Sequence, residues 1–202
     1  FEKVEGLVTL SPLDNGTYEI NGQTFDKVIL ACGAWLGQTL EPLGFEVDVR
    51  PQKGQLRDYF FEGMDTAKLP VLMPEGELDV IPFAGGKISV GASHENDQGF
   101  DLTVDETVLA SLEEEARTYF PDLSTAKSFS ERVGTRAYTS DFSPFFGEVP
   151  ELEGVFVASG LGSSGLTTGP LIGKNLVELA MNRPGSLDSS DYPVSQYVKK
   201  KD

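Results

Sequence analysis

Residues 160–169 form the segment of this sequence best suited to binding a ligand. Four of these ten residues are glycines, and the segment joins an apolar run at 154–158 to a helix-like run that ends near Met181. Glycines let a backbone approach a ligand closely, and the first N–H groups of a helix carry a partial positive charge. We therefore expect the segment to stabilise an electron-rich atom of a planar ligand. The alternative is a tight strand-to-helix connection that binds nothing.

The same segment matches G-x-G-x-x-G over residues 160–165, which is the pattern of a dinucleotide-binding turn. That fingerprint also requires a second strand after the helix, with an acidic residue near its end. Residues 182–188 offer no apolar run, so the pattern does not indicate a pyrophosphate-binding unit. Gly173-Lys174 lacks the upstream glycine of a P-loop, and Ser163 and Ser164 lack the flanking glycines of a nucleophile elbow.

Composition limits the partners. The 202 residues include 32 acidic and 16 basic side chains, so the net charge of −16 disfavours nucleic acid and anionic membranes. No apolar run is long enough to span a bilayer. The single cysteine, Cys32, ends an apolar run and is expected to be a buried thiol, and a chain without disulfides is typical of the cytoplasm. His94 lies in a polar loop, and the nearby acidic residues are too scattered to indicate a metal site.

The elements that must position the glycine segment predict an α+β fold, in which a strand-rich middle is inserted between two parts of another domain. Each flanking part contains an apolar strand, 25–32 or 154–158, followed by a glycine turn and a helix. We expect these two strands to lie side by side in one sheet. Residues 45–61 predict one long strand, or two strands broken at Lys53-Gly54.

Two helices are clear in the pattern. One is expected after Thr103, whose side chain would form a capping box with Glu106, and Pro121 would stop it. The other is expected to be capped by Thr167 or Thr168, with Pro170 near its first turn, and to end near Met181. The polar residues after it predict a loosely held tail.

Five motifs follow one another between residues 24 and 182. They are DKVILACGAW at 26–35, RPQKGQ at 50–55, VGASHE at 90–95, GTRAYTSD at 134–141 followed by Pro144 and Gly147, and ASGLGSSGLTTGP at 158–170. Together they resemble the FAD-dependent amino-acid oxidase family that includes glycine oxidase, sarcosine oxidase and the small subunit of D-amino-acid dehydrogenase.

The resemblance implies an antiparallel-sheet substrate-binding domain inserted between elements of an FAD-binding α/β domain. The implied segments are 1–44 and 141–184 for the FAD domain, 45–140 for the substrate domain, and 185–202 for the tail. It also implies oxidation of the C–N bond of an amino acid or secondary amine by hydride transfer to flavin. Glycine, sarcosine, D-amino acids and related amines are all compatible substrates, and the electron acceptor is open.

The resemblance assigns roles to individual residues. Arg136 would hold the substrate carboxylate, and Tyr138 would bond the substrate or close its pocket; an ordinary ion pair and simple packing are the alternatives. The implied FAD contacts are Gly33, Trp35, Lys53, Gly54, Gln55, Gly160, Gly162, Ser163, Ser164, Gly165, Leu166 and Thr167. Packing is the alternative for Trp35, and a strand-crossing turn is the alternative for residues 53–55. No cysteine lies between 131 and 170, so the FAD is expected to be non-covalently bound.

The sequence departs from the family at one point, because it has no early G-x-G-x-x-G unit to hold the ADP half of FAD. We therefore expect it to be a C-terminal fragment. The alternative is a non-catalytic binding domain, or a partner-dependent subunit completed by another chain. A homo-oligomer is also compatible with the sequence.

Overall fold

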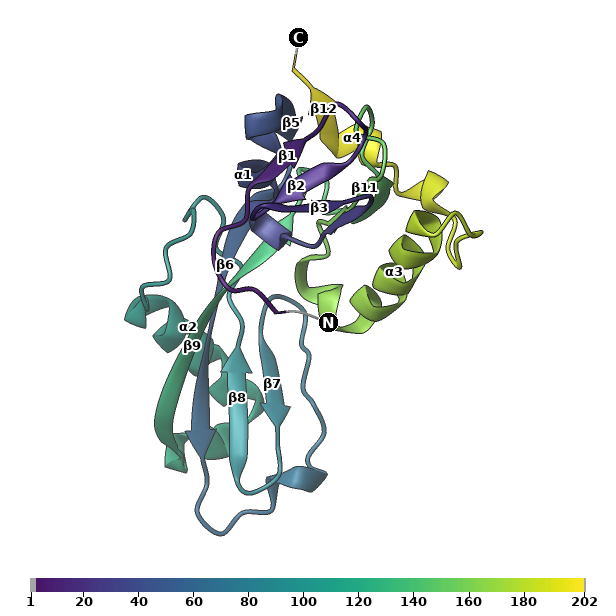
Figure 1. The fold of residues 1–202 in the computed structure, drawn as a ribbon. Coiled ribbons are helices and arrows are strands. Elements are labelled where there is room, and N and C mark those ends of the chain that lie inside the picture. The colour runs from purple at the N-terminus through teal and green to yellow at the C-terminus, as the bar shows by residue number, and fades with distance from the viewer. Residues whose placement is uncertain (1–2, 202) are drawn as a thin grey trace. The chain divides into compact units, whose positions relative to one another are not determined.

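The computed structural model describes residues 3–201 and divides them into two units (Figure 1). The first unit comprises the chain up to Arg50 and from Arg136 onward, and the second runs from Pro51 to Thr135. The expected α+β fold with an inserted antiparallel sheet is confirmed. The boundaries fall inside two long strands, whereas the sequence had suggested residues 45 and 140.

The first unit is built on a three-stranded sheet with the order β10-β11-β4. Strand β11 (Val155–Ser159) runs parallel to β4 (Val28–Leu30), with Phe156 opposite Ile29, and β10 (Phe145–Glu148) is antiparallel to β11. The expectation that the two apolar strands lie side by side is therefore confirmed. Because successive strand residues point to opposite faces, Val28 and Leu30 face the main core while Ile29 faces the other way.

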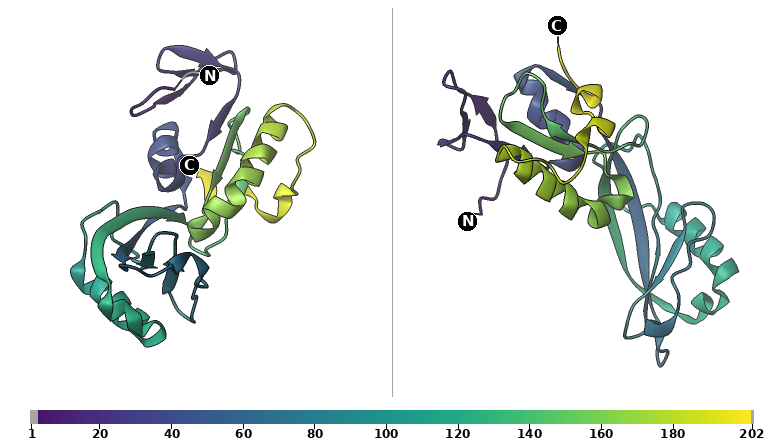
Figure 2. Two further views of the ribbon diagram at one scale, coloured as in Figure 1. Left: turned by 90° about the horizontal axis from the view of Figure 1, so that it is seen from below. Right: turned by 90° about the vertical axis from the view of Figure 1, so that its right-hand side faces the viewer.

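Helix α3 (Gly165–Ala180) packs on β10 and β11, and both views of Figure 2 show this yellow-green helix alongside the green strand β11. Its Ile172 and Leu176 bury Phe146 and Phe156 in a small core. The remaining elements of the unit are β1 (Leu10–Pro12), β2 (Tyr18–Ile20), β3 (Gln23–Phe25), α1 (Leu36–Leu40), β5 (Phe45–Val47), α4 (Val194–Tyr197) and β12 (Val198–Lys200).

The segment after α3, expected to be a loose tail, is instead part of the first unit. Strand β12 pairs with β5, and Val194, Tyr197 and Val198 are buried in the main core. Scattered apolar residues in a polar sequence give only a weak periodic signal, so their burial depends on the tertiary partner that they meet.

The second unit contains an antiparallel sheet with the order β7-β8-β6-β9. Its strands are β6 (Arg50–Phe60), β7 (Asp79–Pro82), β8 (Lys87–Gly91) and β9 (Lys127–Tyr138), and α2 (Glu106–Tyr119) packs on one face of the sheet. The strand predicted over 45–61 is broken, but between Val47 and Arg50 rather than at Lys53-Gly54.

Both helix starts differ from the predictions. Asp105 caps α2 by accepting hydrogen bonds from the N–H groups of Thr107 and Val108, so Thr103 is not the cap. Helix α3 begins at Gly165 after the N-cap Ser164, which places Pro170 inside the helix rather than near its start. A 3-10 turn at Gly162–Ser164 leads into α3, and the N-cap therefore lies three or four residues before the expected threonines.

A buried carboxylate lies on the face of the second unit's sheet that α2 does not cover. Asp58 is flanked in β6 by Arg57 and Tyr59, which bond residues of α2, so its side chain points the other way. It accepts hydrogen bonds from Ser89, Ser130 and Arg132, and it pairs with Lys87 at 3.1 Å. Burial alone raises the pKa of Asp58, but the hydrogen bonds outweigh it and lower the pKa to about 2.

We predict that Asp58→Asn lowers the free energy of unfolding by about 2 kcal/mol at pH 7, because the half-exposed cations Lys87 and Arg132 lose their charge-assisted bonds to the buried carboxylate. The pKa is lowered on folding, so the ionised form stabilises the native state above the ordinary carboxyl pKa and this stability is lost as the pH falls towards 2. A shift from 3.8 to about 2 contributes about 2 kcal/mol. Urea unfolding of both proteins between pH 7 and 3 measures how the free energy of unfolding depends on pH. If the free energy of the variant falls as steeply with pH as that of the wild type, the assigned role of Asp58 is wrong.

Candidate functional site

The glycine segment lies at the carboxyl edge of the parallel strand pair. Strand β4 leads into a 3-10 turn at Gly33–Trp35, and β11 leads into Gly160 and the turn Gly162–Ser164. The Ser159 hydroxyl donates a hydrogen bond to the Gly33 carbonyl at 3.0 Å, which holds the two turns together. In open α/β sheets ligands bind outside the carboxyl ends of the strands. The structure thus places two predicted cofactor-binding turns at one such edge.

The glycines in these turns differ in what surrounds them. All of Gly33, Gly160 and Gly162 have a positive φ, at 54°, 73° and 52°, a conformation that glycine adopts without strain. A Cβ on Gly160 would lie 2.8 Å from the carbonyl oxygen of Ser143 and 2.9 Å from a methyl carbon of Thr139. A Cβ on Gly33 or Gly162 would meet no atom within 4 Å. Gly160 is therefore required for packing, whereas Gly33 and Gly162 border open space that a ligand can enter.

The N-terminus of α3 begins directly after these turns. Its N-cap residue, Ser164, makes no side-chain cap, because its hydroxyl donates to the carbonyl of Leu161 at 2.8 Å. The first turn contains no acidic residue, and Ser163, Leu166 and Thr167 are exposed. A helix end of this kind offers N–H groups and a partial positive charge to an electron-rich group.

The end of β9 reaches the glycine segment through the loop that follows it. Arg136 is half-buried, and Tyr138 is buried and stacked on Phe142 with 5.5 Å between the ring centroids. The next residue, Thr139, is fully buried and lies against Gly160. The first unit therefore brings the strand end that carries both predicted substrate residues to the predicted cofactor segment.

Asp141 fixes this loop, and the sequence reasoning gave it no role. Its carboxylate accepts hydrogen bonds from the backbone N–H of Ser143, from the Thr139 hydroxyl at 3.0 Å and from the Tyr197 hydroxyl at 2.9 Å. The hydrogen bond from Ser143 is the main reason that the pKa of Asp141 is lowered. Burial, and then the bond to Asp141, raise the pKa of Tyr197. The T-x-D spacing at 139–141 is the signal that could have identified this position.

Three predicted FAD contacts, Lys53, Gly54 and Gln55, lie in the second unit. The Gln55 side chain is fully buried, its amide nitrogen donating to Glu95 at 2.7 Å and its amide oxygen accepting from the backbone N–H of Asp105 at 2.7 Å. Lys53 is also buried, and its ammonium lies 3.6 Å from a carboxylate oxygen of Asp101. Within this unit Gln55 thus fastens the start of α2 to β6. Contact with FAD stays a prediction for these residues.

The other candidates do not form a further reactive cluster. Cys32 is a free thiol, half-buried against the main core rather than fully buried. The backbone N–H of His94 donates to Glu77 at 3.1 Å. Within residues 3–201, no group of three or more His, Cys, Asp or Glu side chains is placed to hold a metal ion. Trp35 is 46% exposed.

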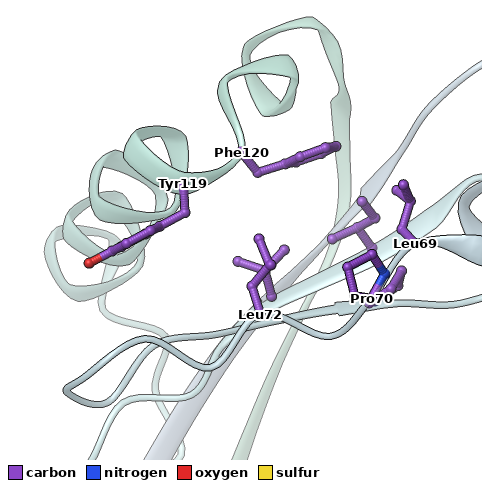
Figure 3. Close-up of a pocket in the computed structure, with 8 residues that line it drawn as sticks. Leu69, Pro70, Leu72, Tyr119 and Phe120 are labelled. Atoms are coloured by element: carbon purple, nitrogen blue, oxygen red, sulfur yellow. The ribbon is translucent and has the colours of Figure 1, made fainter.

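Two of the hollows among the described elements bear on the predicted site. One, of about 450 Å³, lies beside the first turn of α3 in the first unit and includes Ser164 and Thr167 in its wall. The other, of about 210 Å³, lies in the second unit between the end of α2 and the sheet, where Tyr119 and Phe120 face Leu69, Pro70 and Leu72 (Figure 3). None of the predicted site residues lines this second, apolar hollow.

Comparisons with known proteins bear on these observations. A family model described as FAD dependent oxidoreductase matches residues 2–179. The chain is 39% identical to the uncharacterized oxidoreductase YurR of Bacillus subtilis, over 83% of this chain and 45% of that protein. It is 32% identical to a glycine oxidase of Pseudomonas aeruginosa, over 86% of this chain and 46% of that protein. The chain thus spans about half the length of these curated relatives.

Solved structures of oxidases also resemble this chain. Iminodiacetate oxidase from Chelativorans sp. BNC1 is 32% identical with a TM-score of 0.86, and the match covers 93% of this chain and 52% of that one. Glycine oxidase from Geobacillus kaustophilus has a TM-score of 0.84 at 24% identity, a likeness of fold, over 94% of this chain and 51% of that one. Separately, none of the helices described in residues 3–201 has the length and apolar character needed to span a membrane.

We predict that Gly160→Ala lowers the free energy of unfolding by about 3 kcal/mol, because it adds a positive-φ penalty to a close contact with the loop at 139–144. Gly162→Ala is the matched control, since its φ is also positive but its surroundings are open. It should cost only about 1 kcal/mol. Chemical unfolding of both variants measures the difference, and equal losses would contradict the assigned contact.

Proposed function

Because this chain belongs to the FAD-dependent oxidoreductase family, we propose that it forms the substrate-binding part and one wall of the flavin site of an amino-acid or amine oxidoreductase. The reaction would remove a hydride from the carbon beside the nitrogen of the neutral amine and leave an iminium ion, which releases a proton to water and is hydrolysed as the imine. FAD, the cofactor of this family, would supply the hydride acceptor. The observation that carries the proposal is the uncapped start of α3 beside the open glycines of the two turns.

The residues of the first unit fit such a planar, electron-rich group. The open space at Gly33 and Gly162 would admit the ring edge, and the N–H groups at the start of α3 would face its electron-rich atoms. Backbone donors of this kind are held by the fold, so they need no reorganisation when charge develops on the ring. Gly160 would act differently, by keeping the turn packed on the loop at 139–144.

Arg136 is the group best suited to orient the substrate. A guanidinium grips both oxygens of a carboxylate, which fixes the direction of the amino acid as well as its position. Tyr138, held by its stacking on Phe142, would form a rigid wall beside it. The names of two relatives, glycine oxidase and iminodiacetate oxidase, support a small amino acid or an N-substituted glycine as the substrate class.

FAD binding tests the proposed site. We predict that the purified chain binds added FAD, detected as a change in the visible absorbance of the flavin, and that Gly162→Val weakens FAD affinity about tenfold or more, because a side chain fills the open space. Gly16→Val is the control, since Gly16 also has a positive φ and open surroundings but lies in the β1–β2 turn. Equal FAD affinities of the two variants would contradict the assigned cofactor wall. A wild-type chain that leaves the absorbance of added FAD unchanged would contradict it too.

We further predict that Arg136→Leu lowers kcat/KM for glycine or sarcosine by about 10²-fold in a preparation that holds FAD, through a higher KM, because an ion pair to the carboxylate is lost. Arg132→Leu serves as the control, since Arg132 lies on the same strand but pairs with Asp58. Steady-state kinetics separate the two. An unchanged KM for Arg136→Leu would show that Arg136 does not bind the substrate carboxylate.

A further inference from the structure

The side chain of Tyr197 in α4 is held by contacts that do not involve its hydroxyl. The residue is 4% exposed, and its ring stacks on Phe145 of β10 with 4.9 Å between the centroids. Phe145 is itself fully buried and lies opposite Ser159 of β11 in the sheet. The backbone carbonyl of Tyr197 accepts a hydrogen bond from the N–H of Asp48 at 2.8 Å. A buried ring held in this way keeps one rotamer, so its hydroxyl has a fixed position.

That hydroxyl bonds the loop after β9 at Asp141. It donates to the carboxylate at 2.9 Å, and the side-chain amide of Gln196, the preceding residue of α4, donates to the same oxygen at 3.2 Å. Hydrogen bonds to an ionised acceptor are stronger than those between neutral groups. A second contact joins the same two regions, because the hydroxyl of Ser140 donates to the carboxylate of Asp48. Two neighbouring residues of the loop are therefore attached to the segments that surround Tyr197.

The loop has a shape that depends on these attachments. Phe142 has a φ of 60°, which is uncommon for a bulky residue, and its ring stacks on Tyr138. Strained backbone of this kind persists only where the surrounding structure fixes it. The carboxylate of Asp141 does so by accepting the N–H of Ser143, whose carbonyl oxygen lies where a Cβ on Gly160 would fall. The loop thus touches both the glycine turn and a predicted substrate residue.

We propose that Tyr197 is a positioning residue for the Gly160 turn and hence for the flavin wall. Its hydroxyl holds the carboxylate of Asp141, this carboxylate holds the loop, and the loop holds the turn at Gly160. Tyr197 acts through Asp141 and not by touching the ligand. All of these residues belong to the first unit. The inference rests on the proposed function, which makes this turn part of a flavin site.

The test compares two variants that each lose one phenol hydroxyl. Tyr197→Phe keeps the ring that stacks on Phe145 and removes only the bond to Asp141. Tyr18→Phe is the matched control, because Tyr18 is also 4% exposed in the same core and donates to the carbonyl of Glu153 at 2.7 Å. Glu153 precedes β11, whereas Gly160 follows it. Circular dichroism should show that both variants fold, and their thermal midpoints should fall by similar amounts.

Hydrogen–deuterium exchange of the chain without FAD measures the positioning itself. We expect Tyr197→Phe to speed exchange of the backbone N–H groups in residues 139–144 and 160–164 about fivefold, the size of one lost hydrogen bond. Tyr18→Phe should leave both segments at the wild-type rate. Because Tyr197 acts through Asp141, adding Tyr197→Phe to Asp141→Ala should change these rates no further. Wild-type rates in Tyr197→Phe, or an equal increase in Tyr18→Phe, would overturn the proposal.

Titration with FAD tests the consequence for the ligand. Trp35 is the one tryptophan of the sequence and lies in the Gly33–Trp35 turn, so its fluorescence reports on binding at the wall. We expect Tyr197→Phe to weaken FAD affinity about fivefold and Tyr18→Phe to leave it unchanged. An unchanged affinity in Tyr197→Phe would overturn the positioning role. If the wild type does not bind FAD, the proposed function fails, and the exchange rates alone decide whether Tyr197 positions the turn.

Discussion

The parallel pairing of β4 with β11 is the contact from which the first unit is organised. It joins segments that lie on either side of the whole second unit in the sequence. Because both strands point the same way, their two glycine turns reach the same edge, where Ser159 bonds the carbonyl of Gly33. The position of β11 then fixes the start of α3, which follows it directly. It also fixes the loop after β9, because Thr139 in that loop packs against Gly160. Without this pairing, the proposed flavin wall would be two unrelated turns.

The second unit is organised by polar groups as much as by its apolar core. Asp58 bonds four side chains on one face of the sheet. Gln55 of β6 bonds the backbone N–H of Asp105, at the start of α2, through its amide oxygen, and Glu95 through its amide nitrogen. Buried polar groups are stable only when their hydrogen bonds are satisfied, so each fixes the segments that supply its partners. These networks define where the strand carrying residues 53–55 must run.

Much of this arrangement could be predicted from the sequence, because it depends on local patterns. The apolar runs ending at Cys32 and Ala158 indicated neighbouring strands, and the glycines after them indicated turns that other residues cannot adopt. The helix starts could not be fixed in the same way. Thr103 and Asp105 are both acceptable caps, and only the tertiary position of β6, where Gln55 meets the backbone of Asp105, selects one of them.

The roles of Asp141 and Tyr197 were beyond sequence reasoning for a similar cause. Their bond joins the loop after β9 to a segment near the end of the chain, and no spacing rule connects the two. Burial of Val194 and Val198 likewise depends on partners from β5 and the main core. Contacts between distant parts of the sequence therefore determine these positions, which local periodicity does not predict.

The division of the first unit into two stretches of sequence has a consequence for how the chain acquires its structure during synthesis. Residues 51–135 are contiguous, so their contacts can form as soon as that stretch leaves the ribosome. Strand β4 is made before the second unit, whereas its partner β11, and the strand β12 that pairs with β5, are made after it. The apolar surface of β4 stays uncovered until β11 has been made, and closing so long a loop costs conformational entropy. The two turns of the proposed flavin wall can therefore come together only after the second unit has been synthesised.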